Sequence, residues 1–224
     1  MDWQALELSL WLAIATAAIL LPAGVVAGRW LATSAHPLKP LAEAALALPL
    51  ILPPTVLGFY LLVAMGGASL PGSWYRDLTG HTLAFSFEGL LVASVIFNIP
   101  FALMPMQRAF EAIPKELFDA AQTCGLSRWR TLWLVELPLA WRGILSGMIM
   151  TAAHTLGEFG VVLMVGGSIP GETRTIAISI YDRVQAFDLQ SAGIMSATLL
   201  GASLLTLVAT SWLSRTRKPA GWSR

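Results

Sequence analysis

His154 and Glu158 have the greatest potential for chemistry in this 224-residue sequence, because both are titratable and lie in a largely apolar stretch. Their spacing of four residues places them on one face of a helix, where the two side chains can pair. A carboxylate in such a stretch needs a partner. Asn98 and Thr155 add neutral hydrogen-bond donors to two apolar segments. They are candidates for a solute pathway or for hydrogen bonds between helices, and we expect the second role.

No set of residues has the spacing of a familiar catalytic or metal site. The H-E-x-x-H and G-x-S-x-G motifs are absent, and the pair just described does not by itself make a metal site. A phosphate-binding P-loop requires Gly-Lys, but Lys39, Lys115 and Lys218 do not follow a glycine. The single cysteine, Cys124, excludes a disulfide framework and a cysteine metal cluster. We therefore expect no catalytic residue, no metal and no cofactor.

The composition is that of a membrane protein, with 56% hydrophobic and 12% charged residues and a mean hydropathy of +0.68. Soluble proteins have about twice this charge, roughly 25%. A net charge of +1 gives no sign of nucleic-acid binding. Because backbone groups in lipid must bond within the chain, the apolar stretches predict an all-α, polytopic protein with one domain over residues 1–224. The expected spans are 8–30, 42–65, 89–106, 144–165 and 192–213.

The distribution of basic residues predicts the orientation. They gather after the first span, between the third and fourth spans, and in the C-terminal tail. With five spans these regions share one side, so we expect the N-terminus outside and the C-terminus in the cytoplasm. The alternative of a cleaved signal peptide is disfavoured, since the leader contains Asp2 and Glu7 but no Lys or Arg. The basic residues concerned are Arg29, Lys39, Arg108, Lys115, Arg128, Arg130, Arg142, Arg215, Arg217, Lys218 and Arg224.

Residues 107–141 are too charged to span a membrane and are expected to form a cytoplasmic loop. Their pattern predicts a helix over 114–123, a left-handed stop at Gly125, and a second helix that begins after Ser127 and is closed by Pro138. Two short helices that meet at a glycine form a rigid knob suited to docking a partner protein. The alternative is an amphipathic helix lying on the membrane surface, which the glycine break disfavours.

Part of this loop resembles the EAA-x3-G-x9-I-x-L-P loop of ABC importer permeases. The departures are Asp119 for Glu and Val135 for Ile, and the spacing is intact. The resemblance implies a coupling helix that contacts two copies of a separate ATP-binding cassette subunit. The residues implied in this coupling are Asp119, Ala120, Ala121, Gly125, Leu137 and Pro138.

Other segments resemble the oxyanion permeases of this class, chiefly those for molybdate. The segments are T-L-G-E-F-G at 155–160, G-G-S-I-P-G-E-T at 166–173, with Ser168 in place of the usual Asn, and L-I-L-P-P-T-V-L-G-F-Y at 50–60. The resemblance implies an ATP-driven molybdate importer in the bacterial inner membrane, fed by an extracytoplasmic oxyanion-binding protein. A bare carboxylate would repel such a dianion. We therefore expect Glu158 to act as a structural clamp rather than as a ligand.

Several alternatives stay open. One coupling loop and five spans are few for a pathway between two ATPases, so a homodimer is expected. Two stripes of small residues offer close packing, within a subunit or across a dimer. Tungstate or sulfate is an alternative substrate. An intramembrane enzyme or a secondary transporter is disfavoured, because catalytic motifs and internal repeats are absent. The stripes are Gly143-xxx-Gly147-xxx-Thr151 and Gly193-xxx-Ala197-xxx-Gly201.

Overall fold

The computed structural model describes residues 1–214, and all regular structure in this part of the chain is helical, as predicted. The helices differ greatly in length, from one turn to the whole thickness of a membrane. In chain order they are α1 (Trp3–Thr33), α2 (Lys39–Ile51), α3 (Pro54–Met65), α4 (Leu70–Thr79), α5 (Phe87–Glu111), α6 (Lys115–Thr123), α7 (Arg128–Thr131), the π-helical turn η1 (Leu132–Glu136), α8 (Leu137–Gly157), α9 (Gly160–Gly166), α10 (Ile176–Gln185) and α11 (Leu189–Ser214).

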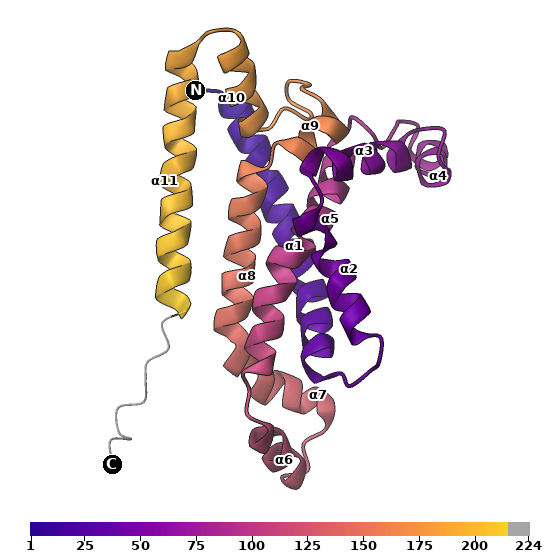
Figure 1. Cartoon of the computed structure of the whole chain (residues 1–224), viewed down its shortest axis with the longest axis vertical. Coiled ribbons are helices and arrows are strands. Elements are labelled where there is room, and N and C mark those ends of the chain that lie inside the picture. The colour runs from indigo at the N-terminus through magenta and orange to yellow at the C-terminus, as the bar shows by residue number, and fades with distance from the viewer. Residues whose placement is uncertain (215–224) are drawn as a thin grey trace.

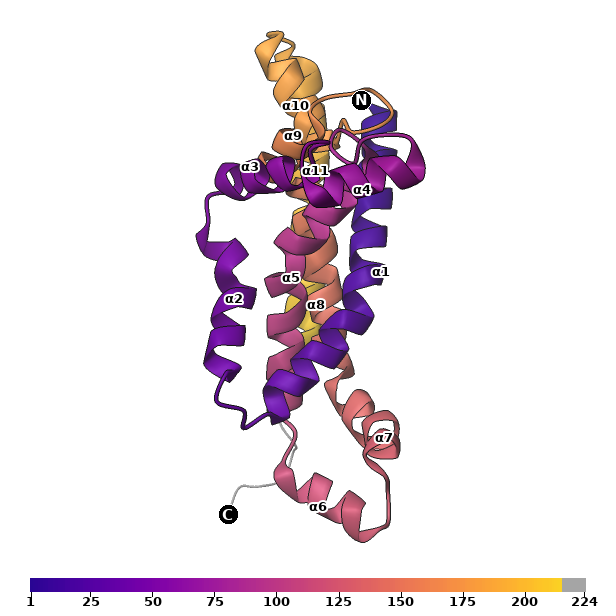
Figure 2. The ribbon, with the colours of Figure 1, turned by 90° about the vertical axis from the view of Figure 1, so that its right-hand side faces the viewer.

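Three long helices, α1, α5 and α8, form the core of the bundle and run side by side (Figures 1 and 2). Glycines allow their backbones to approach closely. Gly28 of α1 lies against the backbone of α5 at Gln107, and Gly147 of α8 lies against the Ala102 carbonyl of α5. Gly143 similarly faces Ala109. The Gly143–Gly147 stripe therefore packs within the subunit, which answers a question that the sequence left open.

Four helical segments among the described residues are long and apolar enough to cross a membrane: α1, α5, the continuous run Arg128–Gly157, and α11. The pair α2–α3 is the fifth if it is counted as one span. The sequence predicts a single second span at 42–65, but the chain bends by 106° between α2 and α3. Pro53 and Pro54 lie at the bend and lack the amide hydrogens that would continue the helix. As a result α3 lies across the bundle rather than along it (Figure 2).

The expected fourth span differs from the structure at its start. Pro138 was expected to close the second loop helix, and this expectation is wrong. Helical structure continues from Arg128 through η1 into α8, with Pro138 in the first turn of α8. Pro138 lacks the amide hydrogen that a position inside a continuous helix would donate, and it directly follows η1, where the regular α-helical hydrogen-bond pattern is already interrupted. The break occurs further on, after Gly157.

Helix α11 packs at the edge of the bundle against α8 and α10. The glycines of its small-residue stripe face away from the rest of the chain, since a side chain at Gly193 or Gly201 would have open space around it. The stripe on α11 is thus not used for packing within the described part of the subunit. The basic residues of the tail, Arg215, Arg217, Lys218 and Arg224, lie outside the described residues.

Candidate functional site

The loop between α5 and α8 forms a compact projection at one end of the bundle (Figures 1 and 2). Helix α6 ends in a left-handed turn at Gly125, whose φ is +74°. The Gly125 amide donates to the Gln122 carbonyl (2.9 Å) and the Leu126 amide donates to the Ala121 carbonyl (3.0 Å). This pattern satisfies the last carbonyls of α6 and needs a residue that tolerates positive φ. The Ser127 hydroxyl then accepts from the Arg130 amide and caps α7, as predicted.

The residues expected to take part in coupling do not lie in one patch. Asp119, Ala120 and Gly125 are exposed on the projection, whereas Ala121 is buried beneath it. Leu137 and Pro138 lie in the first turn of α8. Phe118 of α6 anchors the projection by packing against a buried cluster that joins α5 to the α7–α8 run. The buried members of the cluster are Phe110, Ile113, Leu132 and Ala140.

A buried ion pair that sequence reasoning missed joins the base of this projection to α1. Arg29 donates through Nη2 to Glu136 Oε1 (2.8 Å) and through Nε to Oε2 (2.5 Å). The Glu136 side chain is 1% exposed and that of Arg29 is 30% exposed. One signal was available in the sequence, because Glu136 is a single carboxylate within the apolar run 132–140. Its partner was not identifiable, since Arg29 lies 107 residues earlier.

A polar network crosses the three core helices in the middle of the bundle. The Thr16 hydroxyl of α1 donates to Ser94 Oγ of α5 (3.0 Å), and the Asn98 amide donates to the Ser94 carbonyl (2.9 Å). Asn98 Oδ1 lies 3.1 Å from His154 Nδ1 of α8, whose ring stacks on Phe101. Since the Asn98 amide nitrogen is already engaged, its oxygen accepts from His154. The network thus links α1, α5 and α8.

His154 does not pair with Glu158, and the expected interaction at four-residue spacing is wrong. The helix ends at Gly157, so the regular geometry on which the pairing depended stops one residue short. Glu158 instead lies in the break and its Oε1 accepts from the Val161 amide (3.0 Å) at the start of α9. The residue is buried, at 5% exposure. Thr155, also buried, donates to the Thr151 carbonyl within α8 (2.8 Å).

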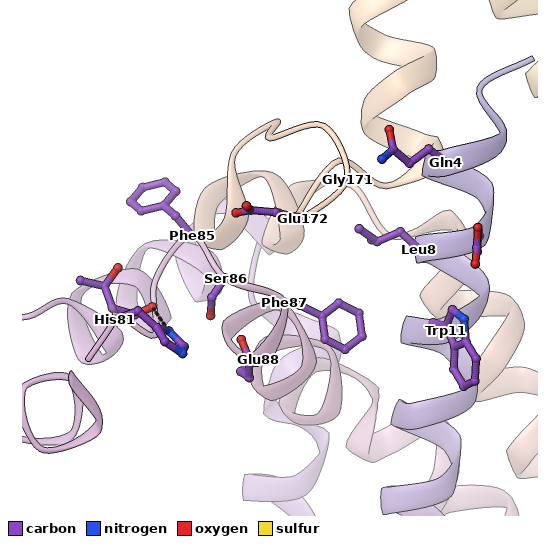
Figure 3. A pocket seen from close by; sticks show the side chains of 12 residues that line it. Gln4, Leu8, Trp11, His81, Phe85, Ser86, Phe87, Glu88, Gly171 and Glu172 are labelled. Atoms are coloured by element: carbon purple, nitrogen blue, oxygen red, sulfur yellow. Dashed lines mark hydrogen bonds between the residues drawn. The ribbon is translucent and has the colours of Figure 1, made fainter. Parts of the chain in front are cut away.

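A hollow of about 860 Å³ opens beside the N-terminal part of α1 (Figure 3), and this end of the bundle lies opposite the projection (Figure 1). Residues of α1, of the segment before α5, of the first turn of α5 and of the loop before α10 surround it (Figure 3). Three carboxylates line it, from Glu7, Glu88 and Glu172. Among the described residues no group of three His, Cys, Asp or Glu is arranged to hold a metal. Because its charges are negative, this hollow is unsuited to holding an anion.

Hydrogen bonds connect the N-terminus of α1 to α10 near this hollow. Asp2 accepts from the Ala5 amide (3.0 Å) and from the Ser179 hydroxyl (2.8 Å). Burial by itself raises the pKa of Asp2, but these two hydrogen bonds, together with Arg174 and Arg183, outweigh it and hold the pKa below its ordinary value.

A second hollow, of about 600 Å³, runs between α5 and α8 towards the projection. Its lining is mostly apolar, including Phe101 and Met150. Two arginines, Arg108 and Arg142, also line it. The two hollows thus differ in charge, negative at one end of the bundle and positive towards the other.

Comparison with known proteins decides the family. Residues 9–216 match the family of binding-protein-dependent transport system inner membrane components. The chain belongs to this family. It is therefore a multi-pass inner membrane component of a transport system, which agrees with its apolar helices.

Two curated relatives are alike in length and sequence. The molybdenum transport system permease protein ModB of Azotobacter vinelandii is 45% identical, over 93% of this chain and 92% of the relative. The protein of the same name from Escherichia coli K12 is 35% identical, over 98% and 97%. The sulfate transport system permease protein CysW of a Synechocystis species is 29% identical, over 92% and 74%.

Solved structures share the fold. A bacterial ABC transporter that imports the polysaccharide alginate matches with a TM-score of 0.72 at 15% identity, covering 96% of this chain and 79% of the other. The same type of transporter in complex with an alginate-bound periplasmic protein matches with a TM-score of 0.68 at 14% identity, covering 94% and 76%.

Proposed function

We propose that the chain is the transmembrane subunit of an ATP-driven molybdate importer. The observation that carries this proposal is the 45% identity to a molybdenum permease over nearly the whole of both chains. The similarity to a sulfate permease is lower, at 29%, and covers less of that protein. The positively charged hollow between α5 and α8 is consistent with passage of a divalent oxyanion, because arginine attracts such anions over several ångströms.

The exposed face of α6 is the proposed contact with a separate ATP-binding subunit. Asp119, Ala120 and Gly125 supply that face, and the buried Ala121 lets α6 lie close to the bundle. Leu137 and Pro138 lie outside this face, at the start of α8, and we propose that they contribute to coupling through that helix. We propose two ATPase copies and a homodimer of this chain, with the small-residue face of α11 available for packing against a neighbour.

The proposed orientation places the α6 projection in the cytoplasm and the N-terminus outside. The basic residues around α6 favour this through the positive-inside tendency, and the N-terminus lies at the opposite end (Figure 1). An extracytoplasmic oxyanion-binding protein would then dock at the end with the acidic hollow. The related alginate transporter has been solved with its periplasmic protein bound, which supports a partner of this type.

The buried polar residues are assigned mainly structural roles. Glu158 holds the start of α9, and Thr155 bonds within its own helix. Asn98 and His154 join α5 to α8 beside the Phe101 ring that lines the positive hollow. Of the four, this pair is the better placed to influence a pathway.

The proposal can be tested in proteoliposomes that contain this chain, its ATPase and its binding protein. We expect ATP-driven uptake of labelled molybdate, with tungstate as a competitor and sulfate as a poor one. Gly125→Leu should abolish uptake, because a side chain at φ +74° is strained and alters the α6 turn. Gly125→Asn is the matched control, since asparagine tolerates a positive φ better than other side chains and should preserve the turn.

The outcomes separate the levels of the proposal. Equal competition by sulfate would overturn the choice of molybdate, and uptake that survives Gly125→Leu would overturn the role of the α6 turn. Failure of the chain to assemble with any ATPase would overturn the importer itself. Tungstate has nearly the size and charge of molybdate, so its competition is expected and does not weaken the proposal.

A further inference from the structure

The Arg29–Glu136 pair lies where three parts of the molecule meet. Arg29 belongs to α1, and Glu136 is the last residue of η1, which connects α7 to α8. Helix α6 reaches the same region through Phe118, which packs against the buried cluster that includes Leu132 of η1. The pair therefore joins α1 to the start of α8, and it lines the same cavity as residues of the projection.

The π-helical turn explains why Glu136 faces α1. The Leu137 amide donates to the Leu132 carbonyl, five residues back instead of four, so the helix contains one additional residue at this point. Such a turn rotates the following side chains relative to a regular α-helix and is frequent at functional positions. It brings a carboxylate of the α7–α8 run into the interior, where Arg29 binds both of its oxygens.

The geometry of the pair makes it a directional link. A planar guanidinium bound to a carboxylate through two parallel hydrogen bonds fixes orientation as well as distance. Glu136 is fully buried, so separating the two groups would leave an uncompensated charge away from water. The pair therefore resists both sliding and rotation of α1 relative to the start of α8.

The space beside the pair is less tightly filled. A cavity of about 170 Å³ lies between α6 and this joint, lined by residues that include Phe118, Gln122 and Arg128 as well as the pair itself. Phe118 and Gln122 of α6 thus face the Arg29–Glu136 pair across this cavity, and α6 is not packed against the pair on all sides. If the Arg29–Glu136 pair were flexible, a displacement of α6 could be absorbed by the cavity. If the pair is rigid, the displacement also moves α1 and α8.

We propose that Arg29 and Glu136 are positioning residues that make α1 and α8 move as one body when α6 is displaced. This inference rests on the proposed function, because it takes α6 as the surface on which an ATPase acts. The pair touches neither nucleotide nor transported anion in this assignment. Through the pair, a displacement of the projection moves α1 and α8 together.

The test is the number of ATP molecules hydrolysed per oxyanion transported by the reconstituted complex. Glu136→Gln removes the charge while keeping the shape, and we expect hydrolysis to persist while transport per ATP falls about tenfold, the change that weakening one charged hydrogen bond produces. The control is Glu111→Gln, which weakens the partly exposed Lys39–Glu111 pair (3.9 Å) near the same end of the bundle and should leave the ratio unchanged.

A double variant separates positioning from stability. Arg29→Met with Glu136→Leu replaces the ion pair by apolar side chains, an exchange that usually preserves folding. We expect this variant to assemble in normal amounts and to remain uncoupled. The inference is overturned if either variant transports at the wild-type ratio, or if transport and hydrolysis fall only in proportion to the amount of assembled complex. Absence of molybdate uptake by the wild-type complex would instead contradict the proposed function.

Discussion

Two helix breaks lie side by side in this bundle, and they are built in different ways. Between α2 and α3 the chain turns at Pro53 and Pro54, and no side chain caps the new helix. Between α8 and α9 it turns after Gly157, and Glu158 caps the Val161 amide. Prolines at a break have no amide hydrogens, so fewer backbone donors there need a hydrogen-bond acceptor. A glycine break keeps them, so a buried carboxylate is needed.

The two breaks also fit together. Helix α3 packs on α9, and the nearest atom to a side chain built at Gly160 would be Cβ of Pro54, at 2.7 Å. Gly58 of α3 is similarly close to Met164 of α9. Gly160 thus leaves room for Pro54 of the neighbouring break. Irregular backbone at membrane depth is tolerated only when it is covered by protein in this way.

The largest effect is expected from Gly160→Leu, which would push α3 away from α9. Overpacking of this kind costs about 1–3 kcal/mol, measured as a lower midpoint of thermal unfolding in detergent. Gly157→Leu is the control, because Gly157 has no neighbouring atoms within 4 Å of an added Cβ. Equal destabilisation by both substitutions would contradict the proposed fit between the breaks.

Glu158→Ala should come next, because the buried Val161 amide would lose its acceptor. We expect a loss of about 1–2 kcal/mol in unfolding free energy. Glu158→Gln keeps a carbonyl oxygen at the same position and should recover most of this loss. If Gln and Ala destabilise equally, the carboxylate has a role other than capping α9.

Asp2 provides a comparison with a carboxylate cap that water can reach. Its lowered pKa means that the folded state favours the charged form, so its contribution is present above the ordinary pKa and is lost as the pH falls through the lower folded-state value. Asp2→Ala should cost at most about 1 kcal/mol at neutral pH, because the group is partly solvated. Unfolding midpoints measured from pH 7 downward should converge for wild type and variant at acidic pH.

The smallest effect is expected at the proline break. Pro54→Ala keeps the Cβ atom that contacts Gly160 and removes no hydrogen bond, so the change in unfolding free energy should stay within about 1 kcal/mol. A loss as large as that of Glu158→Ala would show that the two breaks are stabilised alike. Both variants can be compared in the same thermal unfolding experiment.

The sequence predicts the long helices well and their interruptions less well. Apolar runs locate α1, α5, α8 and α11 because length and hydropathy are local properties. The prolines at 53 and 54 indicate a bend, but its angle of 106° depends on what α3 packs against. Pro138 was misplaced as a helix end because a first-turn proline and a terminating proline follow similar patterns.

In the candidate site, too, the sequence predicts local features better than contacts between distant residues. The turn at Gly125 and the cap at Ser127 follow from adjacent residues, and both are confirmed. The partners of His154 and Glu136 are not as local, whereas Glu158 bonds only three residues further on, at a position that depends on where α8 ends. A helix that ends one residue early redirects Glu158, and contact across the bundle joins His154 to Asn98, 56 residues away. Periodicity alone contains no information about either.

The Arg29–Glu136 pair also has a consequence for synthesis of the chain. Arg29 emerges from the ribosome 107 residues before its partner. At about 5–20 residues per second, this interval lasts on the order of 5–20 seconds. During that time the guanidinium near the end of α1 must remain hydrated or bound to lipid phosphate. The pair can therefore form only after the loop has been made, and a chain truncated before Glu136 keeps Arg29 without this partner.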